Sequence, residues 1–303
     1  MRLGKWVGIL PVLGGLAVAQ ATGTAAPAPL LPPPIQAAWQ GFGGHVSFAA
    51  VNVETGARLE WRADVEVPTA STIKLPIMVE AAYQVAAGRL TWDQPLHLSA
   101  ADKVPGSGIL QDLSEGLTLT LGDAVTLMIV ESDNTATNLV LDKVGISAVN
   151  TRMQALGLQH TVLFKKVFRP PPGPPSPDQA RFGLGKTTAS DMLTLLRLLQ
   201  AHRLVTPAAC DWMLRVLAKQ RDEDGFPRYM DQLRPRLGAL NWAHKTGALD
   251  DVRNDVGILP TSHGTLILAA FAYDSPDHTW TADNAATLVL ARLALASATA
   301  LLP

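Results

Sequence analysis

Segments with the alternating pattern of β-strands lie near both ends of this 303-residue chain, far apart in the sequence. Polar and apolar side chains alternate in residues 45–53 and 58–62, around a Glu-Thr-Gly turn, which predicts an antiparallel hairpin. Three more strands with short turns are predicted at 241–248, 252–259 and 265–273. The two groups together predict one antiparallel sheet of five strands.

Almost everything between the two strand groups has the signals of helices. Thr120 with Asp123 predicts a helix start before residues 124–130. The fold class is therefore α+β, an α/β/α sandwich in which terminal helices flank the sheet and an all-helical lobe is inserted. The other predicted helices are 148–156 after Ser147, 192–199 after Thr188 and Asp191, 208–217 after Thr206-Pro207, and the apolar 283–302, which we expect to pack on the sheet.

The two predicted lobes leave a groove between them. The sheet lobe covers about 35–70 and 220–303, and the helical lobe covers about 71–219. With 48% hydrophobic residues the chain can bury a full core, and its net charge of -1 gives no reason to expect nucleic acid or an anionic membrane as a partner. The proline-rich residues 169–177 predict a stiff, extended loop. We expect a monomer with its functional site in the groove.

The N-terminus has the pattern of a secretory signal peptide over residues 1–21. Arg2 and Lys5 precede an apolar stretch at 6–19, and small residues follow as cleavage candidates. The competing interpretation is a membrane anchor, but the stretch is short for a span and is interrupted by proline and glycine. Cleavage would leave an Ala/Pro-rich, disordered segment at 22–34 and a secreted or periplasmic protein without a stable membrane anchor.

Three short motifs occur in one order and at wide separations. A serine with a lysine three residues later is expected about once or twice by chance in such a chain, whereas each of the two tripeptides is expected on the order of once in several thousand positions. Their conjunction is therefore informative. The motifs are Ser71-Thr72-Ile73-Lys74, Ser132-Asp133-Asn134 and Lys245-Thr246-Gly247.

On these motifs the chain resembles the class A serine β-lactamases and the related low-molecular-weight penicillin-binding proteins. The likeness extends to residues 68–70 before the first motif, 134–139 after the second and 252–257 after the third. It implies a β-lactamase-like catalytic domain over 35–303 that acts on a small molecule, a β-lactam or a D-alanyl peptide, through an acyl-enzyme without a cofactor.

The first two motifs predict the proton chemistry. Ser71 is the predicted nucleophile, and Lys74 would lie one helical turn later on the same face. A lysine with the ordinary pKa of about 10.4 needs a depression of roughly three units to act as a base, which burial and the second cation, Lys245, favour. Ser132 would pass protons between Lys74 and the leaving nitrogen.

The remaining motif residues would bind substrate. By the resemblance, Asp133 fixes its loop, Asn134 grips Lys74 and the substrate's side-chain amide, and Lys245 with Thr246 binds the substrate carboxylate. Gly247 leaves room for ligand beside the strand. The predicted oxyanion hole is formed by the backbone N–H groups of Ser71 and Ala248. Arg253 is either a second carboxylate clamp or a solvated strand arginine.

One family element is missing. Efficient class A enzymes carry a Glu, with an Asn nearby, between the second and third motifs, and this Glu activates the water that hydrolyses the acyl-enzyme. Residues 161–187 contain neither, and their only acid is Asp178. Because a general base contributes about a hundred- to ten-thousand-fold, slow deacylation is expected. Asp178 and Glu131 are the candidate replacements.

Three functions stay open on the sequence. The first is a β-lactam hydrolase with weak turnover, the second a penicillin-binding DD-peptidase or esterase, and the third a covalent β-lactam sensor. A metal-dependent enzyme is disfavoured, because the seven histidines show no ligand spacing and the only cysteine, Cys210, has no partner. We expect Cys210 to be a small buried apolar residue.

Overall fold

The computed structural model describes Met1 and residues 31–302. The predicted signal peptide and most of the Ala/Pro-rich segment lie outside this range. The described domain begins at Leu31, which is buried, and the short helix α1 (Pro33–Ala37) follows it. The first described helix therefore begins at Pro33, before the predicted boundary at residue 35.

Strands from both ends of the chain form one five-stranded antiparallel sheet, as predicted, in the order β2-β1-β10-β9-β8. The pairing of β1 with β10 joins the two ends, with a register from His45 opposite Tyr273 to Asn52 opposite Leu266. β8 is an edge strand. The strands are β1 (His45–Asn52), β2 (Arg58–Trp61), β8 (Ala243–Leu249), β9 (Val252–Thr261) and β10 (Gly264–Tyr273).

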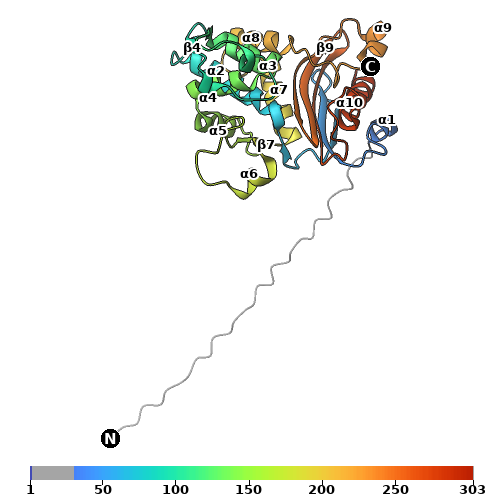
Figure 1. Cartoon of the computed structure of the whole chain (residues 1–303). Coiled ribbons are helices and arrows are strands. Elements are labelled where there is room, and N and C mark those ends of the chain that lie inside the picture. The colour runs from blue at the N-terminus through green and yellow to red at the C-terminus, as the bar shows by residue number, and fades with distance from the viewer. Residues whose placement is uncertain (2–30, 303) are drawn as a thin grey trace. The chain divides into compact units, whose positions relative to one another are not determined.

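Helices cover both faces of the sheet, so the predicted α/β/α layering is present (Figure 1). Successive side chains of a strand point to opposite faces. On β10, Leu266 and Leu268 join the apolar cluster beneath α1 and α10 (Ala285–Leu301), whereas Ile267 and Phe271 join the cluster shared with the helical region. Burial on both faces explains the nearly continuous apolar sequence of β10. In residues 31–302, no helix has the length and apolar character needed to cross a bilayer.

The predicted helix starts depend on capping side chains, and most are confirmed. Thr120 and Asp123 form a reciprocal capping box, and Thr188 and Thr206 each accept a hydrogen bond from the third residue of their helices. Ser147 was wrong as a cap. The chain turns from α4 into α5 at Gly145, whose φ of 84° is accessible to glycine, and Ser147 lies inside α5. The helices between the strand groups are α2 (Lys74–Ala86), α3 (Leu121–Val130), α4 (Asn134–Val144), α5 (Ile146–Ala155), α6 (Pro177–Phe182), α7 (Ala189–Gln200) and α8 (Pro207–Leu217), and α9 (Arg234–Leu237) precedes β8.

The region between the strand groups also contains short strands that the sequence did not predict. β7 (Gly185–Thr187) pairs with both β3 (Val67–Pro68) and β6 (Val162–Leu163). β4 (Pro95–His97) pairs with β5 (Thr118–Thr120). Strands of two or three residues are too short to show an alternating pattern. The proline-rich residues 169–176 form neither helix nor strand, as expected, and α6 begins at Pro177.

Candidate active site

Ser71 lies in a 3₁₀ turn (Ala70–Ile73) that leads directly into α2. Ala70 has a φ of 44° although it carries a side chain, and such strained residues gather at functional sites. The edge strand β8 packs closely against this turn at Gly247. A Cβ atom on Gly247 would lie 3.0 Å from the backbone nitrogen of Ser71, so a glycine is needed for this approach.

Lys74 is fully buried and has three hydrogen-bond acceptors. Its Nζ donates to the carbonyl oxygen of Ser132 at 2.7 Å, to Ser132 Oγ at 3.1 Å and to Asn134 Oδ1 at 2.9 Å. Desolvation, followed by the nearby charge of Lys245, holds the pKa of Lys74 well below its ordinary value. The lowered pKa favours the neutral amine that a base requires; this form has two N–H groups and can donate to only two of the three acceptors at once. All three acceptors belong to the second motif, and none is Ser71.

Ser132 lies between two lysines from opposite sides of the cleft. Lys245 Nζ donates to Ser132 Oγ at 3.1 Å and to the carbonyl oxygen of Thr246 at 2.7 Å. Desolvation lowers the pKa of Lys245 to about 8, while the charges of Asp222 and Asp255 oppose the shift. Because Ser132 Oγ accepts from both lysines, its own proton can be donated to a third group. Ser132 has a φ of 52°.

The side chain of Asp133 points into the protein and holds the loop in front of the second motif. Its carboxylate accepts backbone N–H groups of Ile109 at 2.8 Å, Leu110 at 2.9 Å and Ala136 at 2.8 Å. These contacts fit the role that the resemblance implies for Asp133, which is to fix the loop. Asn134 Nδ2 donates to the carbonyl oxygen of Pro105 at 3.0 Å, so the same loop also fixes the amide that contacts Lys74.

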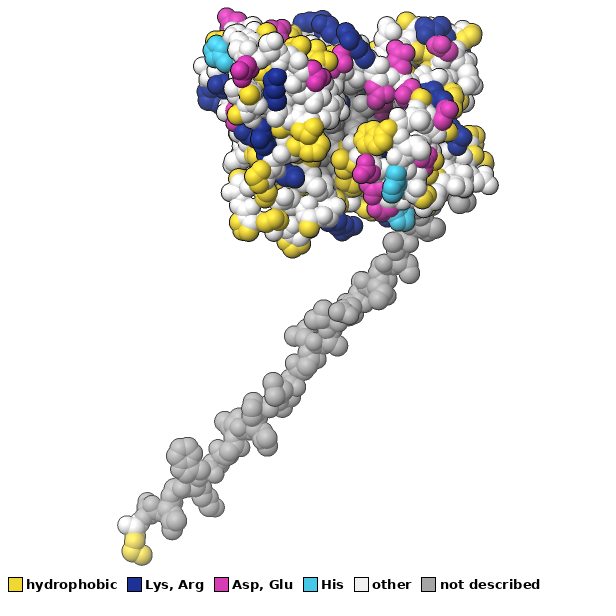
Figure 2. All heavy atoms as spheres, viewed as in Figure 1, with side chains coloured by type: hydrophobic (Ala, Val, Ile, Leu, Met, Phe, Trp, Pro, Cys, Tyr) yellow, Lys and Arg dark blue, Asp and Glu magenta, His cyan; other side chains and the backbone are white. Residues whose placement is uncertain are grey.

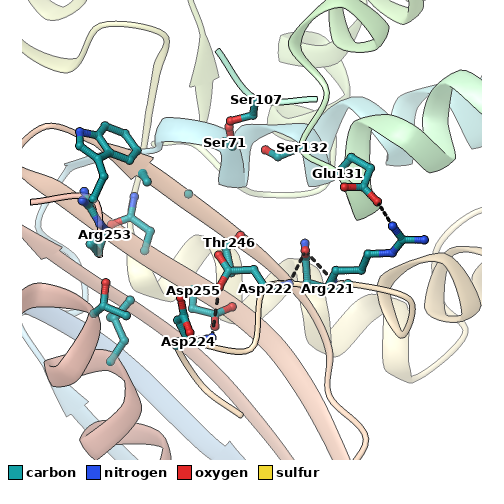
Figure 3. Close-up of a pocket in the computed structure, with 18 of the residues that line it drawn as sticks. Ser71, Ser107, Glu131, Ser132, Arg221, Asp222, Asp224, Thr246, Arg253 and Asp255 are labelled. Carbon is teal, nitrogen blue, oxygen red and sulfur yellow. Dashed lines mark hydrogen bonds and ion pairs between the residues drawn. The ribbon is translucent and has the colours of Figure 1, made fainter. Parts of the chain in front are cut away.

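The motif residues surround one cleft with a volume of about 410 Å³ (Figure 3). The space-filling view shows a groove between the two halves of the domain (Figure 2). The predicted site residues that line the cleft are Ser71, Ser132, Thr246, Gly247, Ala248 and Arg253. The other predicted residues connect to the cleft through hydrogen bonds: Lys74 and Lys245 both donate to Ser132, and Lys74 also donates to Asn134.

Arg253 lies at the cleft but is held by backbone carbonyl groups. Its guanidinium donates to the carbonyl oxygens of Leu249, Val252 and Thr279, and it lies 4.6 Å from the ring centroid of Trp280. The residue is 8% exposed, so the prediction of a solvated arginine on the strand was wrong. Desolvation lowers the pKa of Arg253 from its ordinary value.

Several cleft residues were not found from the sequence. Asp222, Asp224 and Trp280 come from loops whose only sequence signal is polarity or a single aromatic residue. Asp255 lies opposite Thr246 in the sheet and bonds to His244 Nδ1 at 2.9 Å; its burial raises the pKa of its carboxyl group. The alternation of β9 could have indicated Asp255, because it follows Arg253 by two positions and shares its face.

The two candidate replacements for the missing Glu each form an ion pair with a basic residue. Asp178 Oδ2 accepts from Lys186 Nζ at 2.6 Å, and Asp178 is not among the residues that line the cleft. Glu131 lines the cleft but forms an ion pair with Arg221 at 2.7 Å (Figure 3). Residues 31–302 hold no cluster of three or more His, Cys, Asp or Glu residues that could bind a metal ion, and Cys210 is buried.

Comparison with known proteins agrees with this geometry. A sequence model of the β-lactamase enzyme family matches residues 33–300. The chain belongs to this family. The crystal structure of a β-lactamase from Sphaerobacter thermophilus is 34% identical in sequence, with a TM-score of 0.77 over 88% of this chain and 94% of that chain.

Solved structures with lower sequence identity share the fold. PBP-A is 24% identical, with a TM-score of 0.71 over 88% of this chain and 96% of that one, and a PBP-A variant has been solved as an acyl-enzyme complex with penicillin G. A curated relative, β-lactamase CARB-4 of Pseudomonas aeruginosa, is 25% identical over 101 residues. That match covers 33% of this chain and 35% of the relative. The neighbours thus include both β-lactamases and a penicillin-binding protein.

Proposed function

We propose that this member of the β-lactamase family is a serine hydrolase that opens β-lactam rings through an acyl-enzyme on Ser71 and releases the product slowly. The observation that carries the proposal is the hydroxyl of Ser132 held between two fully buried lysines, Lys74 and Lys245, at 3.1 Å from each. Such an arrangement can take a proton from a nucleophile and give one to a leaving nitrogen within one small space.

In the proposed reaction Ser71 Oγ attacks the carbonyl carbon of the ring amide, and its proton passes to the neutral amine of Lys74. The oxyanion is held by the backbone N–H groups of Ser71 and Ala248. The C–N bond then breaks, the nitrogen takes the proton of the Ser132 hydroxyl, and the ammonium of Lys74 replaces that proton. Water finally hydrolyses the ester and restores Ser71.

Substrate binding in this proposal uses the sheet side of the cleft. Lys245 as ammonium, with Thr246, attracts the carboxylate that penicillins and D-alanyl peptides share. Arg253 adds positive charge at the cleft while its position is fixed by its backbone contacts. Asn134 directs one N–H of its amide to Pro105, and the other is assigned to the substrate's side-chain amide.

Slow deacylation is proposed because no described carboxylate is free at the segment where the family carries its Glu. Asp178 is bound to Lys186, and Val167 in this segment is apolar. The same observation favours a second candidate, a penicillin-binding DD-peptidase or esterase. In either case we propose export, based on the leader pattern of residues 1–21.

The test is to mix the purified mature protein with a labelled penicillin and follow the bound label by intact-protein mass spectrometry. We expect one label per chain. Loss of the label within seconds would support an efficient lactamase, and persistence for hours would support slow release. The same sample, assayed for release of D-alanine from a D-Ala-D-Ala peptide, separates the peptidase from the lactamase. Absence of any label on a folded protein would refute the proposal.

A further inference from the structure

Phe168 is a large apolar side chain that is exposed beside the site. The residue is 61% exposed and has a φ of 51°, which is unfavourable for a bulky residue. Six other described residues with side chains have a positive φ; of these, Ala70 adjoins the proposed nucleophile, Ser132 is the proposed proton shuttle, and the other four lie away from the cleft. The conformation of Phe168 persists because the surrounding structure enforces it, and its relevance to the site depends on where the ring lies.

The ring of Phe168 lies close to Asn134. A Cβ atom placed on Gly106 would be 2.8 Å from Asn134 Nδ2 and 3.2 Å from a ring carbon of Phe168. Because both atoms lie next to this one point, the ring carbon is within about 6 Å of the amide nitrogen that is proposed to bind the substrate. Gly106 has a φ of 92°, so both its conformation and this crowding exclude a larger residue.

The backbone next to Phe168 is held firmly. Asn138 Oδ1 accepts from the Val167 N–H at 2.9 Å, and Asn138 Nδ2 donates to the Val167 carbonyl oxygen at 2.9 Å. Asn138 and Val167 are both buried. The two bonds fix Val167 to α4, the helix that starts with Asn134, and so set the position of the exposed ring relative to the site.

We propose that Phe168 is a specificity-determining residue whose ring packs against the acyl side chain of the substrate, which favours substrates with an aromatic or apolar acylamino group. The inference rests on the proposed function. An acylamino group bound to Asn134 extends next to Phe168, where an aromatic contact adds to the burial of apolar surface. We expect this to appear as a difference between substrates with and without the acyl group.

The test compares acylation of Ser71 by benzylpenicillin, which has an aromatic acyl group, and by 6-aminopenicillanic acid, which has none. Phe168→Asn removes the ring, and asparagine tolerates a positive φ. Phe168→Tyr retains the ring. We expect Phe168→Asn to lower the ratio of the two acylation efficiencies by about tenfold, and Phe168→Tyr to keep it within about twofold.

Trp61→Ala provides the control, because Trp61 is also an exposed aromatic residue but lies on β2, the sheet edge opposite β8. It should leave the ratio unchanged. An equal change for both compounds in Phe168→Asn, or no change for either, would overturn the inference while the proposed function stands. If neither compound acylates the folded wild-type protein, the proposed function fails and the inference fails with it.

Discussion

The helical side and the sheet side of the cleft each supply one fully buried lysine to the same hydroxyl, and desolvation lowers the pKa of both, but the charges around the two lysines differ. Desolvation and then the charge of Lys245 hold the pKa of Lys74, from α2, well below its ordinary value, while the charge of Asp133 opposes the shift. Lys245, from β8, has Asp222 and Asp255 nearby, and its pKa is about 8. Burial alone therefore does not decide the role of a lysine.

The two pKa shifts are consistent with different roles for the two lysines. A pKa of about 8 instead of 10.5 corresponds to a penalty on the order of 3 kcal/mol against the charged form, and yet Lys245 stays mostly protonated at pH 7. The pKa of Lys74 is also lowered, by desolvation and by the charge of Lys245, which favours the neutral amine. We therefore assign proton transfer to the helical side and attraction of the substrate carboxylate to the sheet side.

Substitution of the helical-side lysine should have the largest effect. Lys74→Met removes the proposed base, and we expect the acylation rate with benzylpenicillin to fall by about a hundred- to ten-thousand-fold. Stopped-flow measurement of adduct formation gives the rate. Lys143→Met, at an exposed position on α4, is the matched control, and thermal melting shows whether each variant is folded. A loss smaller than about tenfold in a folded Lys74→Met protein would remove Lys74 from the chemistry.

Substitution of the sheet-side lysine should depend on the substrate. Lys245→Met removes an ammonium from the proposed carboxylate site, and a hydrogen bond to a charged group contributes about 1.5–3 kcal/mol. We expect the acylation efficiency with benzylpenicillin to fall by about 10- to 100-fold, and that with its methyl ester to fall much less. Equal losses for acid and ester would contradict the assignment of Lys245 to the carboxylate.

The pH dependence should separate the two sides within the wild-type protein. Protonation of Lys74 removes the base as pH falls, whereas Lys245 loses its positive charge as pH rises through about 8. Acylation efficiency with a carboxylate substrate should therefore decline above about pH 8. Asp222 raises the pKa of Lys245, so Asp222→Asn should move this decline to lower pH. A decline that is unaffected by Asp222→Asn and is shared by the methyl ester would assign it to another group.

The smallest effect is expected at the rim, where the Glu131–Arg221 ion pair lies. Arg221 is largely exposed, and exposed ion pairs contribute about 0–1 kcal/mol. Glu131→Gln should therefore change acylation and deacylation rates by less than about threefold. A large fall in deacylation alone would identify Glu131 as the base for the hydrolytic water.

Local signals in the sequence were sufficient for much of the fold. The strands of the main sheet alternate or are continuously apolar over several residues, and the threonine caps act within one helical turn, so both are visible in short windows. The three motifs also contain most of the proposed chemistry, because Ser71, Ser132 and Thr246 reach the same cleft in the structure. The prediction that Ser147 starts a helix was wrong because the helix α5 begins two residues earlier than expected, after Gly145.

The remainder of the site depends on contacts between distant segments. Phe168 appears in the sequence as one aromatic residue before a proline-rich loop, and only the Asn138 contacts with Val167 and the space left by Gly106 place its ring near Asn134. The environment of Lys245 likewise depends on Asp222, which comes from a loop of irregular structure. No pattern within a single segment indicates either relationship.

Mapping the covalent adduct tests the central claim most directly. The protein is labelled with benzylpenicillin, quenched and digested, and the modified peptide is sequenced by mass spectrometry. We predict that the adduct lies on Ser71 in the wild-type protein and that folded Ser71→Ala carries none. An adduct on Ser132, or on Ser107, which also lines the cleft, would contradict the account, as would undiminished labelling of Ser71→Ala.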